Sequence, residues 1–153
     1  MSAPSITTPA QAAALDAYIK LMRAAESVTA RAHTVLGGDL TLTQFGVLEA
    51  LFHRGPLCAG ALAQKILKSA GNLTLVLANL ERDGLVARER DPSDARRWII
   101  ELTPAGRERI ATLFPLVATS LTSEFSRLSP AEQAMLAELC KKLGRAPDTT
   151  AEA

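Results

Sequence analysis

The sequence predicts a mainly α-helical domain that carries one small β-hairpin. Alanine and leucine are its commonest residues, and aromatic residues make up only 4% of the 153, a composition that favours helix over sheet. Proline and glycine interrupt the chain at intervals of helical length. Only residues 85–103 contain two short segments of β-type residues around a turn, which predicts the hairpin.

Two helices are expected in the first third of the chain. The first is predicted over residues 8–36, because Pro9 suits a first helical position and Gly37-Gly38 supply a stop. Thr43 is the expected N-cap of the second helix, whose apolar residues recur at helical spacing up to the stop at Gly55-Pro56.

The next segment predicts a helix-turn-helix motif. A short helix is expected over residues 59–67, a tight break around residues 68–71, and a longer helix over about residues 69–83 with Gly84 as its C-cap. Two helices joined by a turn of three to four residues form this motif, and the second helix is the one that enters a DNA groove.

A β-hairpin follows directly. Residues 85–90 and 98–103 each have the length of a strand, and Asp91-Pro92-Ser93-Asp94 has the composition of a turn. A hairpin placed directly after a helix-turn-helix makes a winged helix, whose wing is here residues 85–103.

Two further helices are expected within residues 104–144. The first begins at Thr103-Pro104 and should be kinked by Pro115. Ser129 opens a capping box for the second, which ends at Gly144.

The longer helix of the predicted pair has the right size for a DNA major groove. Its first turn and flanks offer short hydrogen-bonding side chains, a glycine that permits close approach, and two lysines suited to phosphates. These residues are Ser69, Asn72, Thr74, Gly71, Lys65 and Lys68. The alternative is that Ser69 is only an N-cap, Asn72 a solvated residue, and the lysines merely exposed.

The wing concentrates charge in a short turn. An arginine at a hairpin tip can enter a narrow minor groove, where the negative potential is focused, and Arg96 is the candidate. Asp94 is placed to hold the Arg96 guanidinium through a bidentate pair. Arg88 and Arg97 are placed to reach the DNA backbone. The alternative is a solvated charged turn of little energetic value.

The stretch LERDGLVARERDPSDARRWIIELTPAGRERI (residues 80–110) resembles the MarR family of bacterial winged-helix transcription regulators. The shared pattern is Leu-Glu-x-x-Gly-Leu-Val, a charged wing with Asp and Arg, then Leu-Thr-x-x-Gly, and the resemblance extends over about residues 10–144. It implies that Arg96 is the arginine used in the minor groove. Members commonly read Asp-Arg-Arg, whereas this chain has Asp94-Ala95-Arg96, so Ala95 replaces the first arginine.

The resemblance also implies a single domain over residues 1–153 that forms a homodimer. The winged helix-turn-helix would span about residues 43–103. The helices at about 8–36 and 104–144 would interlock with those of a second copy and present two recognition helices to a palindromic operator in double-stranded DNA. Long apolar helices at both ends of the chain support this, because they exceed what one small winged helix needs to cover.

Many members of the family are repressors that small phenolic, quinone-like or other lipophilic molecules release from DNA. Such effectors bind between the dimer helices and the DNA-binding part. The residues of this chain expected to face that cleft are Tyr18, His33, Phe45, Phe52 and His53. The alternative is that these are core or boundary residues.

Two other kinds of function remain open. Cys58 directly precedes a predicted helix, whose N-terminus can lower a thiol pKa, so a thiol-based redox regulator is one alternative. A winged helix that binds only proteins is the other. No nucleophile–base pair, carboxylate pair, phosphate loop or metal-ligand set supports an enzyme, a cofactor or a metal. A cytoplasmic location without membrane association is expected, because no apolar run is long enough to span a bilayer and the N-terminus does not resemble a secretory signal.

Overall fold

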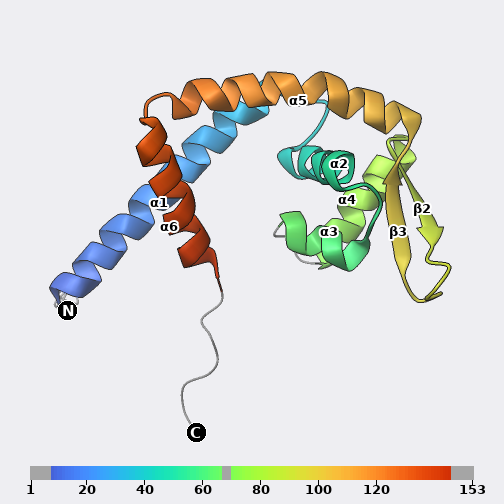
Figure 1. Ribbon diagram of the computed structural model, residues 1–153, viewed down its shortest axis with the longest axis horizontal. Helices are drawn as coiled ribbons and strands as arrows, with labels where there is room; N and C mark the ends of the chain where they lie inside the picture. Colours follow the sequence, from blue (N-terminus) through green and yellow to red (C-terminus); the bar gives the residue numbers. More distant parts are fainter. Residues whose placement is uncertain (1–7, 67–69, 146–153) are drawn as a thin grey trace, which may run out of the picture.

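The computed structural model of the chain describes residues 8–66 and 70–145 (Figure 1). Its elements are α1 (Pro9–Val35), α2 (Leu42–Arg54), β1 (Leu57–Cys58), α3 (Ala59–Ile66), α4 (Ala70–Arg82), β2 (Val86–Arg90), β3 (Trp98–Leu102), α5 (Pro104–Phe125) and α6 (Pro130–Gly144). The predicted fold class, a mainly helical domain with a small β wing, is confirmed.

One antiparallel sheet contains the three strands in the order β1-β3-β2. β2 and β3 form the predicted hairpin, and the last pair of their register is Arg90 opposite Trp98. β1 was not predicted from the sequence. It is two residues long, too short to show alternation, and it exists because the packing of α2 and α3 brings Leu57 opposite Ile100 of β3.

The hydrophobic core lies between α2, α3, α4, the sheet and the first half of α5. Fully buried side chains come from each of these elements: Leu48, Leu62, Leu80, Ile100 and Ile110. Burying one such side chain contributes about 1.5–3 kcal/mol, so this shared core holds α4 and the wing in a fixed relation. We call residues 41–103 the lobe.

α2 begins earlier than predicted, because Thr41 rather than Thr43 is its N-cap. The Thr41 hydroxyl accepts a hydrogen bond from the Gln44 N–H at 3.1 Å, and the Gln44 side chain accepts one from the Thr41 N–H at 2.9 Å. Both threonines are suitable N-cap residues. The reciprocal bond with Gln44, three residues after Thr41, decides between them.

The Leu-Thr-x-x-Gly segment forms the joint between the wing and α5. The Thr103 hydroxyl donates to the Gly84 carbonyl at 2.6 Å and accepts from the Gly106 N–H at 3.0 Å. Gly84 has a φ of +72°, a conformation that favours glycine. A Cβ on Gly106 would lie 1.9 Å from the Leu85 carbonyl oxygen, so only glycine fits at this position.

α5 runs along one side of the molecule and joins the lobe to the two remaining helices, α1 and α6 (Figure 1). We call α1, α6 and the part of α5 beyond Pro115 the arm. An ion pair of 2.7 Å between Arg31 and Glu124 ties α1 to α5. α6 buries none of its side chains within the chain. In the described part of the chain, no helix is both long and apolar enough to cross a membrane.

Candidate nucleic-acid interface

α4 turns one face into the core and the other to solvent. Leu73, Leu77 and Leu80 are buried, at the spacing of one helix face. Asn72 and Thr74, two of the predicted DNA contacts, are exposed in the first half of the helix. The packing of the leucines therefore presents the polar residues of α4 outward.

Leu75 lies among these exposed residues and was missed by the sequence analysis. Its side chain is 64% exposed, although the helix around it is well packed. Apolar side chains in a major groove contact the methyl group of thymine. In the sequence Leu75 lies close to the core residues Leu73 and Leu77, so its hydrophobicity does not distinguish it from them. Its position around the helix axis places it on the exposed face.

The remaining predicted contacts near α4 have different positions. Lys65 is exposed in the last turn of α3. Gly71 lies in the first turn of the α4 backbone. Lys68 and Ser69 fall outside the described residues.

The turn of the wing is organised by its acidic residues. The Asp94 carboxylate accepts the backbone N–H of Arg96 at 3.0 Å, and the Asp91 carboxylate accepts both the N–H and the hydroxyl of Ser93. The bonds from Ser93 lower the pKa of Asp91. In this structure Asp94 bonds to the backbone N–H of Arg96, as an aspartate in a turn readily does with the residue two ahead, and its pairing with the Arg96 guanidinium stays a prediction. The exposed Arg96 side chain is thus left at the surface of the wing.

Arg97, which was predicted to reach the DNA backbone, is exposed and forms a hydrogen bond within the protein. Its Nη2 donates to the Cys58 Sγ at 3.1 Å. The Cys58 thiol also accepts from the backbone N–H of Ala61, because Cys58 directly precedes α3. These bonds, the one from Ala61 first and then the one from Arg97, hold the pKa of Cys58 below its ordinary value.

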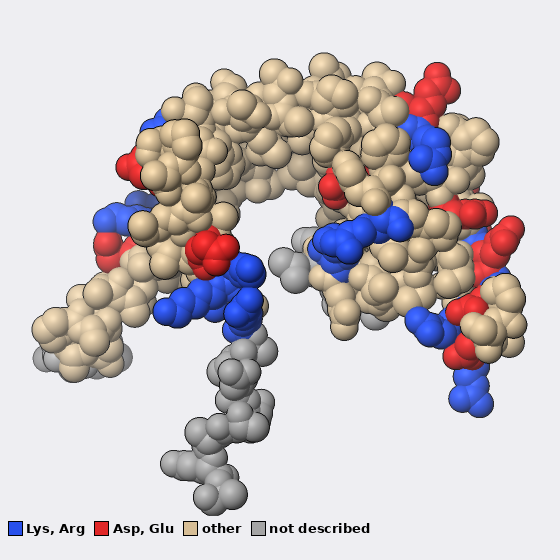
Figure 2. All heavy atoms as spheres, viewed as in Figure 1, with Lys and Arg blue, Asp and Glu red and all other residues tan. Residues whose placement is uncertain are grey.

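Arg88 is also engaged within the protein. Its Nη2 forms a 2.6 Å ion pair with Glu81 of α4, and its guanidinium lies 5.7 Å from the centre of the Trp98 ring. Arg88 thus links α4 to β2 in this structure, and its contact with the DNA backbone stays a prediction. Figure 2 shows acidic and basic side chains mixed along the wing, with a basic group projecting at its free end.

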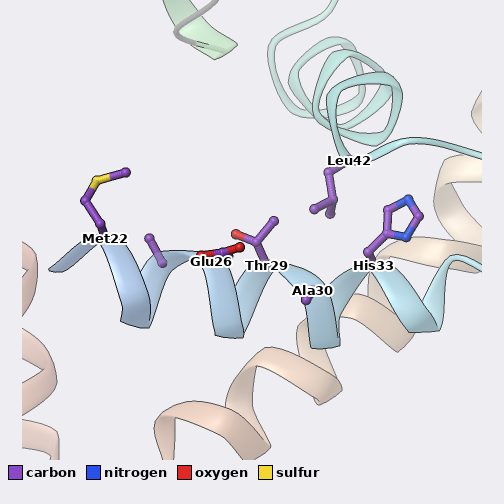
Figure 3. Close-up of a pocket in the computed structure, with 7 residues that line it drawn as sticks. Met22, Glu26, Thr29, Ala30, His33 and Leu42 are labelled. Carbon is purple, nitrogen blue, oxygen red and sulfur yellow. The ribbon is translucent and has the colours of Figure 1, made fainter. Parts of the chain in front are cut away.

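A groove of about 630 Å³ lies between α1 and the start of α2 (Figure 3). Its lining is mostly apolar and comes from α1, apart from one residue of α2: Met22, Ala25, Glu26, Thr29, Ala30, His33 and Leu42. An adjoining groove shares Thr29 and Leu42 and extends to Lys65 of α3. The two grooves thus connect the arm with the helix that precedes α4.

Of the five residues predicted to face an effector, only His33 lines this groove within one chain. Phe45 belongs to the hydrophobic core, and Tyr18 is 60% exposed on α1. Phe52 and His53 form a ring cluster instead, with ring centres 5.3 Å apart. The spacing of the five residues along the sequence could not show that they lie in different parts of the structure.

The MarR family profile matches residues 40–98, which include most of the lobe. Two curated relatives are from Bacillus subtilis. The uncharacterized HTH-type transcriptional regulator YkoM is 41% identical over 102 residues, which are 67% of this chain and 66% of YkoM, just under two thirds. The HTH-type transcriptional regulator MhqR is 31% identical over 131 residues, which are 85% of this chain and 90% of MhqR.

A solved structure with the same fold is BpsR of Bordetella bronchiseptica, whose DNA binding is regulated by 6-hydroxynicotinic acid. It has a TM-score of 0.78 and 27% sequence identity, and the match covers 85% of this chain and 99% of BpsR. The match to MhqR extends over nearly the full length of both chains. The chain therefore belongs to the MarR family of DNA-binding transcriptional regulators, whose members are not enzymes.

Proposed function

We propose that the protein is a homodimeric transcriptional repressor that binds a palindromic operator, with α4 in the major groove and the wing in the minor groove. The observation that carries this proposal is the arrangement of one rigid lobe. Its core holds the exposed face of α4 beside a wing that ends in the exposed Arg96. Asn72 and Thr74 would then contact bases in the major groove at the same time as Arg96 contacts the minor groove.

The apolar surface of the arm supports a homodimer. Large apolar side chains are exposed on α1 and α6: Leu15, Tyr18, Ile19, Met22, Met135, Leu136, Leu139 and Leu143. Leaving each in water forgoes about 1.5–3 kcal/mol relative to burial. Two copies related by a two-fold axis would cover these surfaces with each other and place two copies of α4 on the DNA.

The groove between α1 and α2 is the proposed effector site. Its lining is mostly apolar, and among the described residues that line it, Glu26 and His33 carry the ionisable side chains. A neutral phenol or quinone would place its ring on the apolar wall and direct its oxygens to Glu26 and His33. A carboxylate ligand would instead meet an acidic residue. The regulation of BpsR by a small aromatic molecule supports effector control in general.

The position of the groove suggests how binding would release DNA. Its walls belong to α1 of the arm and to Leu42 of α2, and the adjoining groove reaches Lys65. A ligand between arm and lobe would therefore change the angle between them. In a dimer that angle sets the distance between the two copies of α4, so the spacing would no longer match the operator.

Thiol control at Cys58 is the second candidate, and the bond from Arg97 favours it. Oxidation of the Cys58 thiol by hydrogen peroxide, which yields a sulfenic acid and water, would move the acceptor of that bond from Sγ to the added oxygen and add volume where β1 meets the wing. The wing would then shift relative to α4.

A gel-shift assay with the promoter region beside the protein's own gene tests the proposed DNA binding. We expect Arg96→Ala to weaken binding by about 1–3 kcal/mol, roughly 5- to 150-fold. The control Arg23→Ala removes the same charge from α1 and should bind like the wild type. Equal binding by wild type and Arg96→Ala would rule out the role of the wing. Absence of binding by either at low salt would point instead to a protein-interaction module.

Effector control is tested by a thermal-shift screen of phenols, quinones and aromatic acids, followed by DNA-release assays. Neutral phenols or quinones should stabilise the protein and release DNA, and Glu26→Gln should weaken this response. A response to aromatic acids alone, unchanged in Glu26→Gln, would exclude the α1–α2 groove as the site we describe.

A further inference from the structure

A continuous series of side-chain contacts joins α4 to the tip of the wing. Glu81 of α4 pairs with Arg88 of β2 at 2.6 Å. The guanidinium carbon of Arg88 lies 5.7 Å from the ring centre of Trp98, and that of Arg90 lies 4.1 Å from the same centre. Arg90 Nη1 in turn donates to the backbone carbonyl of Ala95 in the turn. Each of these residues is bonded or stacked to the next.

The register of the hairpin explains this arrangement. Arg90 stands directly opposite Trp98, and Arg88 lies two residues away on the same face of β2. Trp98 is 39% exposed and does not belong to the hydrophobic core. Its ring lies against the two arginines, so its role differs from that of the buried residues that stabilise the lobe.

We propose that Trp98 is a positioning residue for DNA binding. By holding Arg90, which holds the Ala95 carbonyl, Trp98 keeps the tip of the wing in one conformation relative to α4. Arg96, the residue next to Ala95, is then ordered before DNA arrives. Ordering a contact in advance lowers the entropy cost of binding. This inference rests on the proposed role of Arg96 in the minor groove.

The test is a double-mutant cycle between Trp98 and Arg96, measured by DNA affinity. A cation–π contact at an exposed site corresponds to about a two- to fivefold change in an equilibrium constant, so Trp98→Leu should raise the Kd by about that factor or somewhat more. In the Arg96→Ala background the same change should have no further effect. Trp98→Phe, which keeps an aromatic ring, should retain most of the affinity.

Three results would overturn the inference while leaving the proposed function intact. They are wild-type affinity in Trp98→Leu, an equal loss in both Arg96 backgrounds, and a loss in Trp98→Phe as large as in Trp98→Leu. If Arg96→Ala alone binds like the wild type, the proposed function of the wing fails first. The single Arg96 variant therefore separates the two failures.

Tryptophan fluorescence gives a second measurement, which tests the contact between Arg90 and Trp98 directly. Trp98 is the only tryptophan of the 153 residues, so the tryptophan emission of the free protein, excited selectively over Tyr18, reports on the wing alone. Arg90→Gln uncovers one face of the ring and should increase quenching by acrylamide, with a loss of DNA affinity similar to that of Trp98→Leu. Arg82→Gln, at the end of α4, is the control. Unchanged quenching in Arg90→Gln would show that the contact is not formed in solution.

Discussion

Arg97 of the wing donates a hydrogen bond to the Cys58 thiol at 3.1 Å, although 39 positions separate the two residues. The bond joins the residue just before β3 to the last residue of β1. It engages within the protein an arginine that the sequence assigned to DNA. It also gives the thiol a cationic neighbour in addition to the backbone donor Ala61.

This contact predicts how the reactivity of Cys58 depends on pH. In a Cys140→Ser background, the pH midpoint of iodoacetamide alkylation should be lower for the folded protein than for the urea-unfolded chain, because Arg97 and the Ala61 N–H favour the thiolate. Arg97→Ala should move the folded midpoint upward. Identical midpoints for the folded and unfolded protein would contradict the geometry.

The same shift has a consequence for stability. A pKa that is lower in the folded state stabilises the fold above the pKa of the unfolded thiol, and this stabilisation is lost as the pH falls through the folded pKa. Cys58→Ser should therefore lower the free energy of unfolding more in alkaline than in neutral solution. Chemical denaturation at several pH values measures this, and a pH-independent difference would count against it.

Gly106→Ala should destabilise the protein strongly. The new Cβ would lie 1.9 Å from the Leu85 carbonyl oxygen, so the joint between wing and α5 would have to move. We expect a loss of about 2–4 kcal/mol in the free energy of unfolding, in the range of severe packing defects. Gly60→Ala in α3 is the matched control, because its Cβ would meet no atom within 4 Å and should be neutral or stabilising.

Leu75 should read a thymine methyl group. Replacing the contacted thymine of the operator by uracil should weaken wild-type binding several-fold, and Leu75→Ala should bind both operators equally. A scan of single uracil substitutions, measured by gel shift, locates the position. If no thymine in the operator shows this dependence, Leu75 faces the phosphates or solvent.

Leu139→Glu should weaken the proposed dimer. Leu139 is exposed on α6 within one chain, and a two-fold interface would lose about 1.5–3 kcal/mol from each copy. Sedimentation at several protein concentrations should show a shift toward monomer. Lys141→Glu changes charge by more but removes no leucine, so it should remain dimeric. A Leu139→Glu protein that stays dimeric would place the interface elsewhere.

Most elements followed from signals that act over a few residues. The capping box at Ser129, proline at first helical positions and the turn around Asp91 predicted helices and the hairpin. The position at the hairpin tip and the resemblance to the MarR family singled out Arg96 among the exposed arginines of the wing. Such signals depend on the hydrogen bonds and the periodicity of one segment alone. They can therefore be recognised in the sequence without any knowledge of the fold.

The tertiary structure decided which side chains are partners. Arg97 bonds to Cys58, Arg88 to Glu81, and Asp94 to a backbone N–H instead of a guanidinium. These choices depend on which elements the hydrophobic core brings together, and several donors along the sequence compete for each acceptor. The strand β1 and the groove beside His33 arise in the same way, from contacts between segments that carry no signal for one another.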